Sequence, residues 1–564
     1  MISNLTINSF LERNILLSKD LINDINEEEV NEILSIINEK VPNSKSLLVL
    51  NKDLLFLLKS SENIVETNWF EFEKARVMLE LGKDDKIYNT FLNILNYNIS
   101  PDKKEIMNSL LGDTEKNIET NNVGIEITDN KESLIVVRSY VDKYIKKREI
   151  QDFVSYYNQR FEFFRRLLKG RSELQSAISI NRLKNKQDRE DVAIIGMVSN
   201  KSISKNGNLI VTLEDVTGEI KIVFNKNREN LYDEASEIVC DEIIGITGVF
   251  SGSIIFANNL FFPDIPKSHE LKKSPDETYA AFISDIHVGS KKFLRKEFMR
   301  FIDWINGNIG SKEQRNTALK VKYLFIVGDN VDGVGVYPGQ EEHLEIKDYY
   351  EQYNQLSEIL KQIRKDVKMV MCPGQHDASR LAEPQSIIME KYAKSLYEID
   401  NLTLVTNPAV INIHSSETFE GFNVLIYHGA SFHYYISVID KLRNNKANEN
   451  PSLVLKYLLK RRHLAPTHES FAFIPDPEQD PRVINAYVDN SISKIPDFFI
   501  AGDMHHVDVN SYNNITLINC SCWQSRTDFE IKVGNMPDPC KVPIVNLMTR
   551  EIKIMKFGEE DGRE

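Results

Sequence analysis

Apolar and polar residues follow different periods along this chain, and each period predicts a different kind of element. In residues 1–97 the apolar positions recur at helical spacing, which predicts a helical N-terminal domain. One such helix, in EEEVNEILSIINE, would bury Val30, Ile33, Leu34 and Ile37. Residues 98–135 are rich in Asn, Lys, Glu and Asp and poor in aromatic residues, which predicts a flexible linker.

Helical spacing returns in a segment that we place at residues 136–188. Its apolar positions are Ile150, Phe153, Val154, Tyr157, Phe161, Phe164, Leu167 and Leu168. Its basic residues are Lys146, Lys147, Arg148, Arg160, Arg165, Arg166, Lys169 and Arg171. We favour an amphipathic helix with a solvated charged face, and direct contact with nucleic acid is the alternative.

The period changes to two in residues 189–265. Five runs, separated by Asn-Gly, Thr-Gly and Ser-Gly turn signals, read DVAIIGMVSN, NLIVTLED, EIKIVFN, EIIGITGVF and SIIFANNLFF. Such a series of short strands resembles an OB-fold barrel, a fold that often binds single strands through stacked aromatic rings. We expect Phe224, Phe250 and Phe256 in the core, and therefore favour a structural or subunit-docking barrel. The Pro- and Lys-containing residues 263–278 are predicted to link it to the next domain.

Five further apolar runs each end on residues that can bind metal ions. They read FISDIH, LFIVGDNVDG, VMCPGQHD, VLIYHGAS and FFIAGDMHH, and their β-branched and aromatic residues indicate buried strands. The residues at the strand ends are Asp285, His287, Asp329, Asp332, Gln375, His376, Asp377, His428, Asp503, His505 and His506. One strand that ends in such residues means little, but five in succession predict a single site assembled from strand-end loops.

The residue types of these loops predict a reaction class. Carboxylate and imidazole together suit Mn²⁺, Fe or Zn²⁺ better than Ca²⁺, which prefers oxygen ligands. Two ions roughly 3.5–4 Å apart, joined by a bridging carboxylate, can clamp a phosphodiester and activate water. A histidine that is not a ligand would then protonate the leaving group. Tight turns that bring the backbone close to the site are predicted at Gly328, Gly333, Gly374, Gly429 and Gly502.

The order Asp-x-His, Gly-Asp-x-x-Asp, Gly-Asn-His-Asp, His and Gly-His-x-His resembles the calcineurin-like metallophosphoesterases. The stretches GDNVDGVGVYPGQ (328–340) and PGQHDASRLAEPQ (373–385) resemble one branch more closely. That branch is the small subunit of the archaeal family-D DNA polymerase, a relative of the B-subunits of eukaryotic replicative polymerases. The resemblance covers roughly residues 140–564. It implies an α/β multidomain fold, with a metallophosphoesterase β-sandwich flanked by helices at residues 276–564.

The resemblance also implies a role for each motif residue. The first metal ion would be bound by Asp285, His287, Asp329 and His505, with Asp329 bridging to the second. The second ion would be bound by Gln375, His428 and Asp503, and His376 would act as the general acid. Asp332 and Asp377 would orient these groups rather than bind metal. The expected cofactors are two divalent ions, with Mn or Mg favoured.

Two positions depart from the family pattern. Gln375 stands where the family has Asn, and Asp503 stands where the family has the first His of Gly-His-x-His. In an extended segment residues 503 and 505 face one way and His506 the other, which supports this register. Both departures fall on the second metal ion, so we expect it to bind more weakly than the first. The remaining histidines are expected to be surface or packing residues: His269, His343, His414, His433, His463 and His468.

Composition favours a subunit over an independent nuclease. The 564 residues carry a net charge of −14, whereas a stand-alone DNA-binding protein is usually basic. We therefore expect a large catalytic subunit that carries polymerisation and brings primer–template and single-stranded DNA to this chain. By the resemblance to the family-D small subunits, this chain would supply a metal-dependent 3′→5′ exonuclease for proofreading. The alternatives are a scaffolding subunit with a decayed site and a free phosphodiesterase that acts on nucleotides.

Other features of the sequence bound the cellular setting. The five cysteines are too few and too scattered for a disulfide framework, and Cys520-x-Cys522 lacks a second pair, so we expect buried thiols. The N-terminus has neither a basic region nor a sustained apolar core, and no window reaches the roughly 18 apolar residues of a membrane span. We expect a soluble, cytoplasmic protein.

Overall fold

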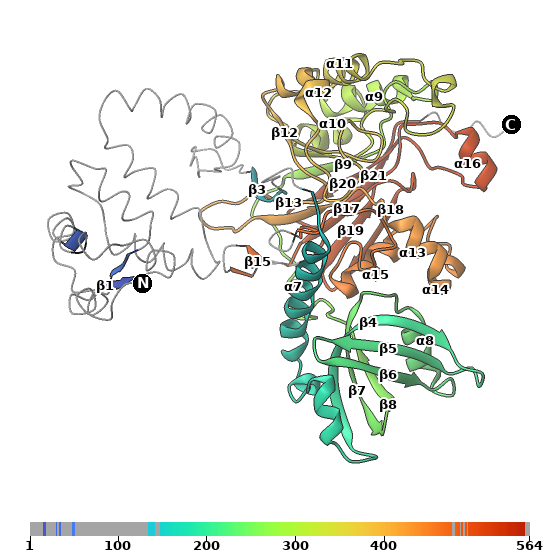
Figure 1. Ribbon diagram of the computed structural model, residues 1–564. Helices are drawn as coiled ribbons and strands as arrows, with labels where there is room; N and C mark the ends of the chain where they lie inside the picture. The colour runs from blue at the N-terminus through green and yellow to red at the C-terminus, as the bar shows by residue number, and fades with distance from the viewer. Residues whose placement is uncertain are drawn as a thin grey trace. The chain divides into compact units, whose positions relative to one another are not determined.

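The computed structural model describes residues 134–140, 147–476 and 495–558, together with shorter pieces at 15–17, 30, 33–34, 48–50, 480–484, 487–488 and 491–492. The chain divides into two compact units (Figure 1). The first comprises residues 1–126 with 487–491, and the second comprises residues 127–486 with 492–564.

The described N-terminal residues of the first unit include two short strands. They are β1 (Ile15–Leu17) and β2 (Leu48–Leu50), which pair in parallel. The purely helical prediction for residues 1–97 is therefore wrong at these strands, since it rests on local spacing and the paired strands lie far apart in sequence. Three positions of the predicted apolar helix face, Val30, Ile33 and Leu34, are helical and buried. The rest of that prediction, and most of the linker at 98–135, lie outside the described residues.

A closed β-barrel follows in the second unit, with strand order β4-β5-β6-β8-β7. Its strands are β4 (Asp191–Ile203), β5 (Leu209–Asp215), β6 (Gly218–Phe224), β7 (Ile243–Ser251) and β8 (Ile254–Phe261), with α8 (Glu229–Ser236) between β6 and β7. The five strands are those that the period of two predicts. Phe224 and Phe250 are buried as expected, but Phe256 is 46% exposed. The register of β8 explains this correction, because Ile255 and Ala257 point into the barrel and Phe256 must point out.

The segment before the barrel differs from its prediction in two respects. It begins with strand β3 (Leu134–Arg138), which pairs with β13 of a later sheet, so residues 134 and 135 belong to a strand and not to a linker. Helix α7 (Ile150–Lys169) then runs alongside the barrel (Figure 1). Its first residue, Ile150, is 84% exposed, although the helical spacing places it on the buried face. The short helices η2 (Ser172–Leu174) and η3 (Ile180–Asn185) lead into β4.

Arg160 of α7 is predicted on a solvated or DNA-contacting face but is buried. Its guanidinium donates to the backbone oxygens of Asp241, in the barrel, and of Pro466 at 2.7 Å. A second buried arginine, Arg461, places its Nε 2.6 Å from Glu242 Oε1. These charges join the barrel to the following domain because each arginine satisfies carbonyl or carboxylate oxygens that would otherwise be buried without partners.

Residues from 279 onward form two six-stranded sheets together with β3. The first has the order β12-β11-β10-β9-β20-β21, with β9 to β12 parallel. Its strands are β9 (Tyr279–Ile283), β10 (Val321–Val327), β11 (Lys368–Cys372), β12 (Leu402–Leu404), β20 (Lys541–Asn546) and β21 (Ile552–Lys556). Parallel strands covered on both faces need apolar residues at every position, which is why their sequences read as unbroken apolar runs.

The second sheet has the order β18-β19-β17-β14-β13-β3, with β14, β17 and β19 parallel. Its remaining strands are β13 (Ala409–Ile413), β14 (Phe422–Ile426), β17 (Phe498–Ala501), β18 (Asp508–Tyr512) and β19 (Ile515–Asn519). A separate two-stranded sheet consists of β15 (Tyr487–Val488) and β16 (Ser491–Ile492).

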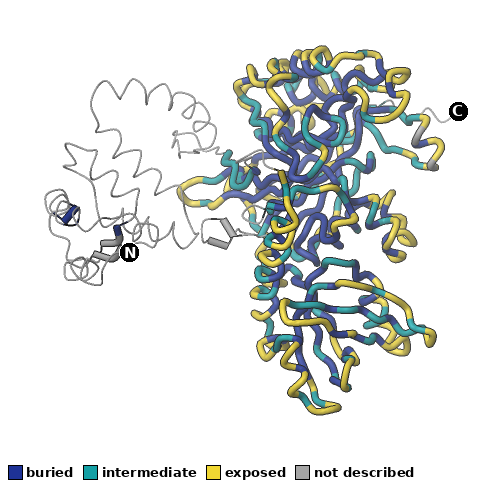
Figure 2. The backbone as a smooth tube through the Cα atoms, viewed as in Figure 1, coloured by how far each residue is buried: buried dark blue, intermediate teal, exposed yellow. Residues whose placement is uncertain are grey.

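The two large sheets pack face to face, with helices on both outer faces. Side chains such as Phe282 and Phe325 of the first sheet and Ile426 and Phe498 of the second share one buried cluster. Helices on the first sheet are α9 (Arg295–Ile305), α10 (Lys312–Leu319), α11 (Tyr349–Leu360) and α12 (Glu390–Tyr397), and η4 (Gln340–Glu342) precedes α11. Helices on the second are α13 (Phe432–Val438), α14 (Asp440–Asn444) and α15 (Ser452–Arg461). Figure 2 shows the buried residues concentrated along the sheets, with exposed residues on the outer helices and loops.

Two expectations about composition can be compared with this fold. All five cysteines are free, and Cys372, Cys520, Cys522 and Cys540 are buried. Among the described helices, none combines the length and the apolar character that crossing a membrane requires.

Candidate metal centre

The five predicted strand ends meet at one place. The loops that follow β9, β10 and β11 come from neighbouring strands of the first sheet, and those that follow β14 and β17 come from neighbouring strands of the second. Left-handed backbone conformations cluster in these loops, with φ values of +47° to +67° at Asp285, His287, Asp329, Asp503 and His505. A non-glycine residue rarely adopts this conformation, which costs of order 1 kcal/mol or more, so the surrounding structure holds these side chains in place.

The left-handed conformations correct one step of the sequence argument. That step takes residues 503 to 505 as an extended segment whose alternate side chains face the same way. Asp503 and His505 instead have φ values of +67° and +56°. Both side chains reach the site because the loop after β17 turns there, and not because of strand periodicity.

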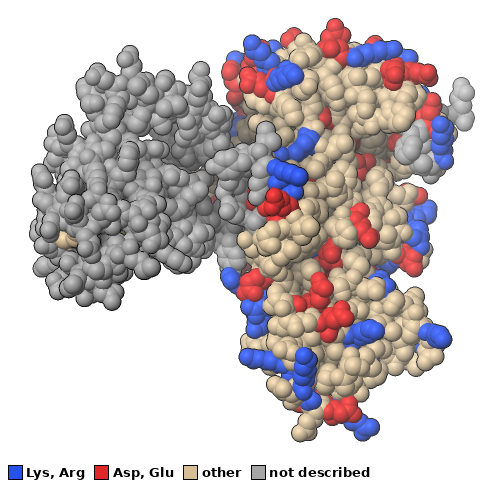
Figure 3. Space-filling view, in the orientation of Figure 1, with Lys and Arg blue, Asp and Glu red and all other residues tan. Residues whose placement is uncertain are grey.

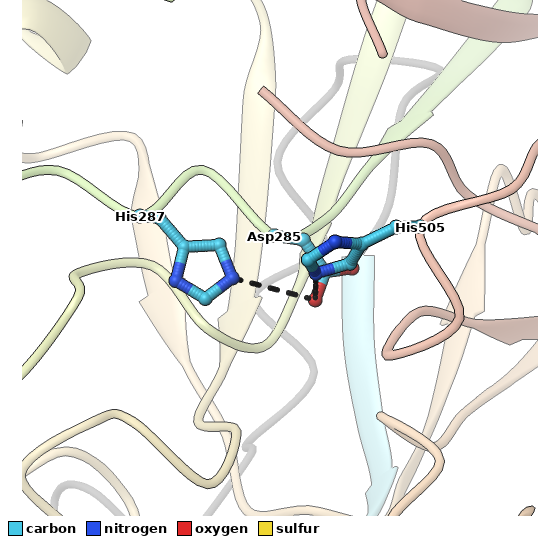
Figure 4. A group of neighbouring side chains, drawn as sticks. All are labelled: Asp285, His287 and His505. Carbon is cyan, nitrogen blue, oxygen red and sulfur yellow. Dashed lines mark ion pairs between the residues drawn. The ribbon is translucent and has the colours of Figure 1, made fainter. Parts of the chain in front are cut away.

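Asp285, His287 and His505 form a first group of potential ligands (Figure 4). Asp285 Oδ1 lies 4.0 Å from His287 Nε2 and 3.5 Å from His505 Nε2. A carboxylate holds each imidazole ring through its Nδ1 atom. His287 Nδ1 lies 3.1 Å from Asp332 Oδ1, and His505 Nδ1 lies 3.0 Å from Glu530 Oε1. The Nε2 atoms therefore face the centre of the site, which is the usual arrangement around a bound metal ion.

Asp329 occupies the middle of the site. Its Oδ2 lies 3.3 Å from His428 Nε2, 3.9 Å from His376 Nε2 and 4.0 Å from His287 Nε2. It belongs to two groups of potential ligands, one with Asp285 and His428 and one with His287 and His376. A carboxylate in this position can serve two neighbouring ions, as the bridging role requires.

Several atoms of the site are buried without any hydrogen-bond partner. They are Asp285 Oδ1, His287 Nε2, Gln375 Oε1, His428 Nε2 and Asp503 Oδ2. A buried polar atom without a partner costs roughly 1–3 kcal/mol, and native structures contain few of them. Asp285, His287 and His428 also belong to the groups of potential ligands around this centre, and a divalent cation there would satisfy their unpartnered atoms.

The electrostatics of the cluster also favour cations. Burial would lower the pKa of His428, but the charges of Asp329 and Asp285 raise it to about 10. Burial would raise the pKa of Asp329, but His428 and His376 hold it far below its ordinary value. The carboxylates therefore attract positive charge strongly, and protons compete with metal ions for the same histidine nitrogens.

The two residues that depart from the family pattern contact each other. Gln375 Nε2 donates to Asp503 Oδ1 at 2.9 Å, and Asp503 Oδ1 lies 3.8 Å from His428 Nε2. Both residues thus lie beside His428, where the sequence places the second ion. The hydrogen bond uses the amide nitrogen of Gln375 and leaves its oxygen buried without a partner.

Asp332 and Asp377, which are predicted to orient the site, both contact its residues and loops. Asp332 fixes His287 through its carboxylate, and its backbone oxygen lies 2.7 Å from His376 Nδ1. Asp377 accepts hydrogen bonds from Gly374 N at 2.9 Å and from Tyr353 Oη at 2.9 Å, and so ties the loop after β11 to helix α11. Burial, reinforced by the charge of Asp329, raises the pKa of Asp377 to about 6.

Sequence reasoning misses two residues of this site. Glu530 lies in α16 (Asp528–Val533), where it also completes a capping box with Thr527. The pattern TDFE predicts such a helix start, but nothing in it points to His505. His433, which is expected from the sequence to be a surface or packing residue, has its Nε2 atom 3.5 Å from Asp503 Oδ2.

Comparison with known proteins identifies the family. Residues 280–509 match the family of the B-subunits of DNA polymerases alpha and epsilon, and residues 192–254 match the OB-fold nucleic acid binding domain. The DNA polymerase II small subunit of Methanothermobacter thermautotrophicus is 39% identical over 411 residues, which are 73% of this chain and 80% of that protein. The chain belongs to the archaeal DNA polymerase II small subunits. It is the small subunit of a family-D DNA polymerase.

Other small subunits of this polymerase give the same result. That of Archaeoglobus fulgidus is 36% identical over 428 residues, which are 76% of this chain and 81% of the relative. That of Pyrococcus furiosus is 37% identical over 413 residues, which are 72% of this chain but only 64% of the relative. The barrel of this polymerase subunit is an OB-fold, because residues 192–254 match that domain and the five strands close into a barrel.

A methyl group added at Gly374 should disrupt the centre of this polymerase subunit. A Cβ atom there would lie 2.2 Å from Asp329 Oδ1 and 2.7 Å from His428 Nε2, closer than atoms can approach. We expect Gly374→Ala to weaken Mn²⁺ binding by more than about tenfold, measured by titration calorimetry. Gly558→Ala is the matched control, since its Cβ would meet Cys540 at an ordinary 3.6 Å. Equal Mn²⁺ affinity in the two variants would contradict this packing.

Glu383, behind the site, should make the stability of the subunit depend on pH. Burial raises its pKa to about 7, although Tyr427 Oη donates to it at 2.7 Å. The folded protein therefore holds a proton that the unfolded chain releases above about pH 4.5. The protonated Glu383 therefore contributes fully to the free energy of unfolding below about pH 4.5. This contribution is lost as the pH rises through about 7, and the free energy of unfolding falls by about 3 kcal/mol.

Urea unfolding at pH 5 and pH 8 measures this effect. We expect Glu383→Gln to lose less stability than the natural protein over that interval, because a neutral amide has no proton to release. The exposed Glu358→Gln should behave like the natural protein. The assignment is wrong if the Glu383 and Glu358 variants show the same pH dependence.

Proposed function

We propose that this subunit is a metal-dependent 3′→5′ exonuclease that removes mismatched nucleotides from a primer, and that its two-sheet domain is a calcineurin-like metallophosphoesterase. The observation that carries the proposal is the convergence of unpartnered buried ligand atoms, such as Asp285 Oδ1, His287 Nε2 and His428 Nε2, around the Asp329 carboxylate. A purely scaffolding subunit has no physical need for this arrangement, and it would be more stable with those polar atoms removed.

The proposed ligand sets are those that the resemblance to the metallophosphoesterases implies, and the groups of potential ligands around Asp329 support them in part. The first ion would be held by Asp285, His287, Asp329 and His505, and the second by Gln375, His428, Asp503 and Asp329. Bound Mn or Mg ions would supply the positive charge that activates water and stabilises the leaving oxygen of the phosphodiester. Oxygen and imidazole donors in these numbers suit Mn²⁺ in particular.

His376 is placed to donate the proton that the leaving oxygen needs. Its Nδ1 is 2.7 Å from the backbone oxygen of Asp332 and donates to it, so that only Nε2 is available to the substrate. Its side chain is 21% exposed, unlike the buried His287 and His428. A partly exposed imidazole with one nitrogen already fixed can carry a proton to a substrate oxygen without leaving its position.

The charge of the chain supports a role within a larger enzyme. On the face shown in Figure 3, acidic and basic side chains are interspersed over the described part of the molecule. With a net charge of −14, the subunit attracts DNA weakly. We therefore propose that the large catalytic subunit carries polymerisation and delivers the primer end. The barrel then serves in docking, with single-strand binding as its second candidate role.

A labelled primer tests the reaction and its direction. The substrate is a 5′-labelled primer with a mismatched 3′ end, incubated with Mn²⁺ and the full chain, alone and with the large subunit. We expect stepwise shortening from the 3′ end that stops on addition of EDTA. A primer with a 3′-terminal phosphorothioate should be shortened more slowly. Internal cuts, release from the 5′ end or activity in EDTA would contradict the proposal.

Deletion of the first unit tests where the large subunit binds. The deletion should stop at residue 126, because β3 begins at Leu134 and completes the second sheet. We expect the remaining chain to keep its affinity for the large subunit, since the barrel and the two-sheet domain stay intact. Co-purification and calorimetry measure this. A folded deletion variant that no longer binds would place the dock in residues 1–126.

A further inference from the structure

The second half of the candidate centre lacks an imidazole that the family pattern supplies at position 503. Among the ligands proposed for the second ion, His428 is the only histidine. Asp503 is shorter than histidine, and its Oδ1 is already hydrogen-bonded to Gln375 Nε2 at 2.9 Å. An ion on this side would have carboxylate and amide oxygens but few nitrogen donors.

His433 lies beside this oxygen-rich side of the centre. It is the second residue of α13, and its Nε2 atom lies 3.5 Å from Asp503 Oδ2. Two atoms that are each about 2.1 Å from one ion lie about 3–3.5 Å from each other. The observed separation therefore fits two ligands of a single ion.

The fold holds the start of α13 against Asp503. Phe432 is fully buried in the core beneath the helix, which fixes the residue next to His433. The preceding loop passes close to Asp503, because a Cβ atom at Gly429 would lie 3.1 Å from the Asp503 Cβ. Gly429 itself has φ +129°, a conformation that favours glycine. Packing of Phe432 and of the preceding loop thus sets the backbone position of His433, and the side chain itself stays exposed.

His433 contacts one of the atoms that a cation would satisfy, Asp503 Oδ2. Asp503 Oδ2, Gln375 Oε1 and His428 Nε2 are all buried and have no hydrogen-bond partner. The His433 side chain is 70% exposed, so it can adjust to an ion at little cost in packing. A simple surface ion pair between His433 and Asp503 would leave the Gln375 and His428 atoms unsatisfied.

We propose that His433 is a ligand of the second metal ion and supplies the imidazole that Asp503 cannot. The second ion is then held by His428, His433, Asp503 and the amide oxygen of Gln375, with Asp329 shared. This inference rests on the proposed metal centre and not on the reaction assigned to it. It also changes which metal we expect at the second site. A site with two imidazole ligands suits Mn²⁺ or Zn²⁺ better than Mg²⁺.

Metal titration of the full chain tests the assignment without reference to catalysis. Calorimetry with Mn²⁺ should find two sites in the natural protein. We expect His433→Ala to weaken the second site by more than tenfold and to leave the first unchanged. His468→Ala is the matched control, because His468 is also exposed and pairs with a carboxylate, Asp241, at 2.6 Å outside the site. Circular dichroism should show that both variants remain folded.

A second substitution separates ligand loss from indirect effects. Asp503→His in the His433→Ala background returns an imidazole to the family position, so it should restore the affinity of the second site. The inference is overturned if His433→Ala binds two ions as tightly as the natural protein, if the natural protein binds only one, or if Asp503→His restores nothing. Two intact sites in a protein that does not shorten DNA would refute the proposed reaction and leave the role of His433 standing.

Discussion

Replacing Asp329 by alanine should remove both metal ions and lower exonuclease activity by far more than 10²-fold. The Asp329 carboxylate is within 4.0 Å of His287 and 3.3 Å of His428, which belong to the two different ligand sets. Loss of a shared carboxylate therefore weakens both sites at once, whereas loss of an unshared ligand weakens one. Metal content after dialysis, together with shortening of a labelled primer, measures the effect.

The control for this variant is an aspartate outside the site. Asp366 is partly exposed and pairs with Lys322 and Arg364 at the surface, so Asp366→Ala should keep both ions and full activity. An Asp329→Ala protein that shortens DNA near the natural rate would show that the activity comes from another site or from a contaminant.

Replacing His376 by alanine should lower the rate by about 10²–10⁴-fold while both metal ions stay bound. This is the usual contribution of a general acid, and it applies when the ring binds no ion. The alternative is that His376 is itself a metal ligand. It has a geometric basis, because His376 Nε2 is 3.9 Å from Asp329 Oδ2 and His376 belongs to one group of potential ligands. Single-turnover rates and calorimetry on the same preparations separate the two roles.

His343→Ala serves as the control for His376, because the His343 ring lies 3.0 Å from the hydroxyl of Tyr337 and is not one of the proposed ligands. It should keep both the rate and the metal content. If His376→Ala loses one ion, His376 is a ligand and the proton must come from another group.

The strand ends are predictable from the sequence because each signal is local. An unbroken apolar run followed by Asp285 or His428 indicates a buried strand and a polar loop, and loops at one edge of a parallel sheet lie close together. The meeting of the His428 loop, from the second sheet, with the Asp285 loop, from the first, depends on how the two sheets pack. The barrel is predictable for the same reason, since a period of two fixes which side chains point inward. Phe256 shows the limit of that argument. It lies between the apolar residues Ile255 and Ala257, so the pattern alone does not say whether Phe256 or its two neighbours point into the core.

Contacts between distant segments are not predictable in this way. The sequence groups Arg160 with the basic residues of a helix, and only the folded chain reveals that it reaches the backbone of Asp241 and Pro466. The sequence likewise gives no sign that His433 approaches Asp503, because that contact depends on how α13 packs on the second sheet. The left-handed conformations at Asp285 and Asp503 also have no signal in the residue types, since glycine is the residue that usually marks them.

Anomalous diffraction at the manganese edge, from crystals of the full chain grown with Mn²⁺, tests the central claim most directly. We predict two peaks roughly 3.5–4 Å apart, one on each side of the Asp329 carboxylate. The first peak should contact Asp285, His287 and His505, and the second should contact His428 and Asp503. An absence of peaks within reach of Asp329, at Mn²⁺ concentrations that support primer shortening, would contradict the account.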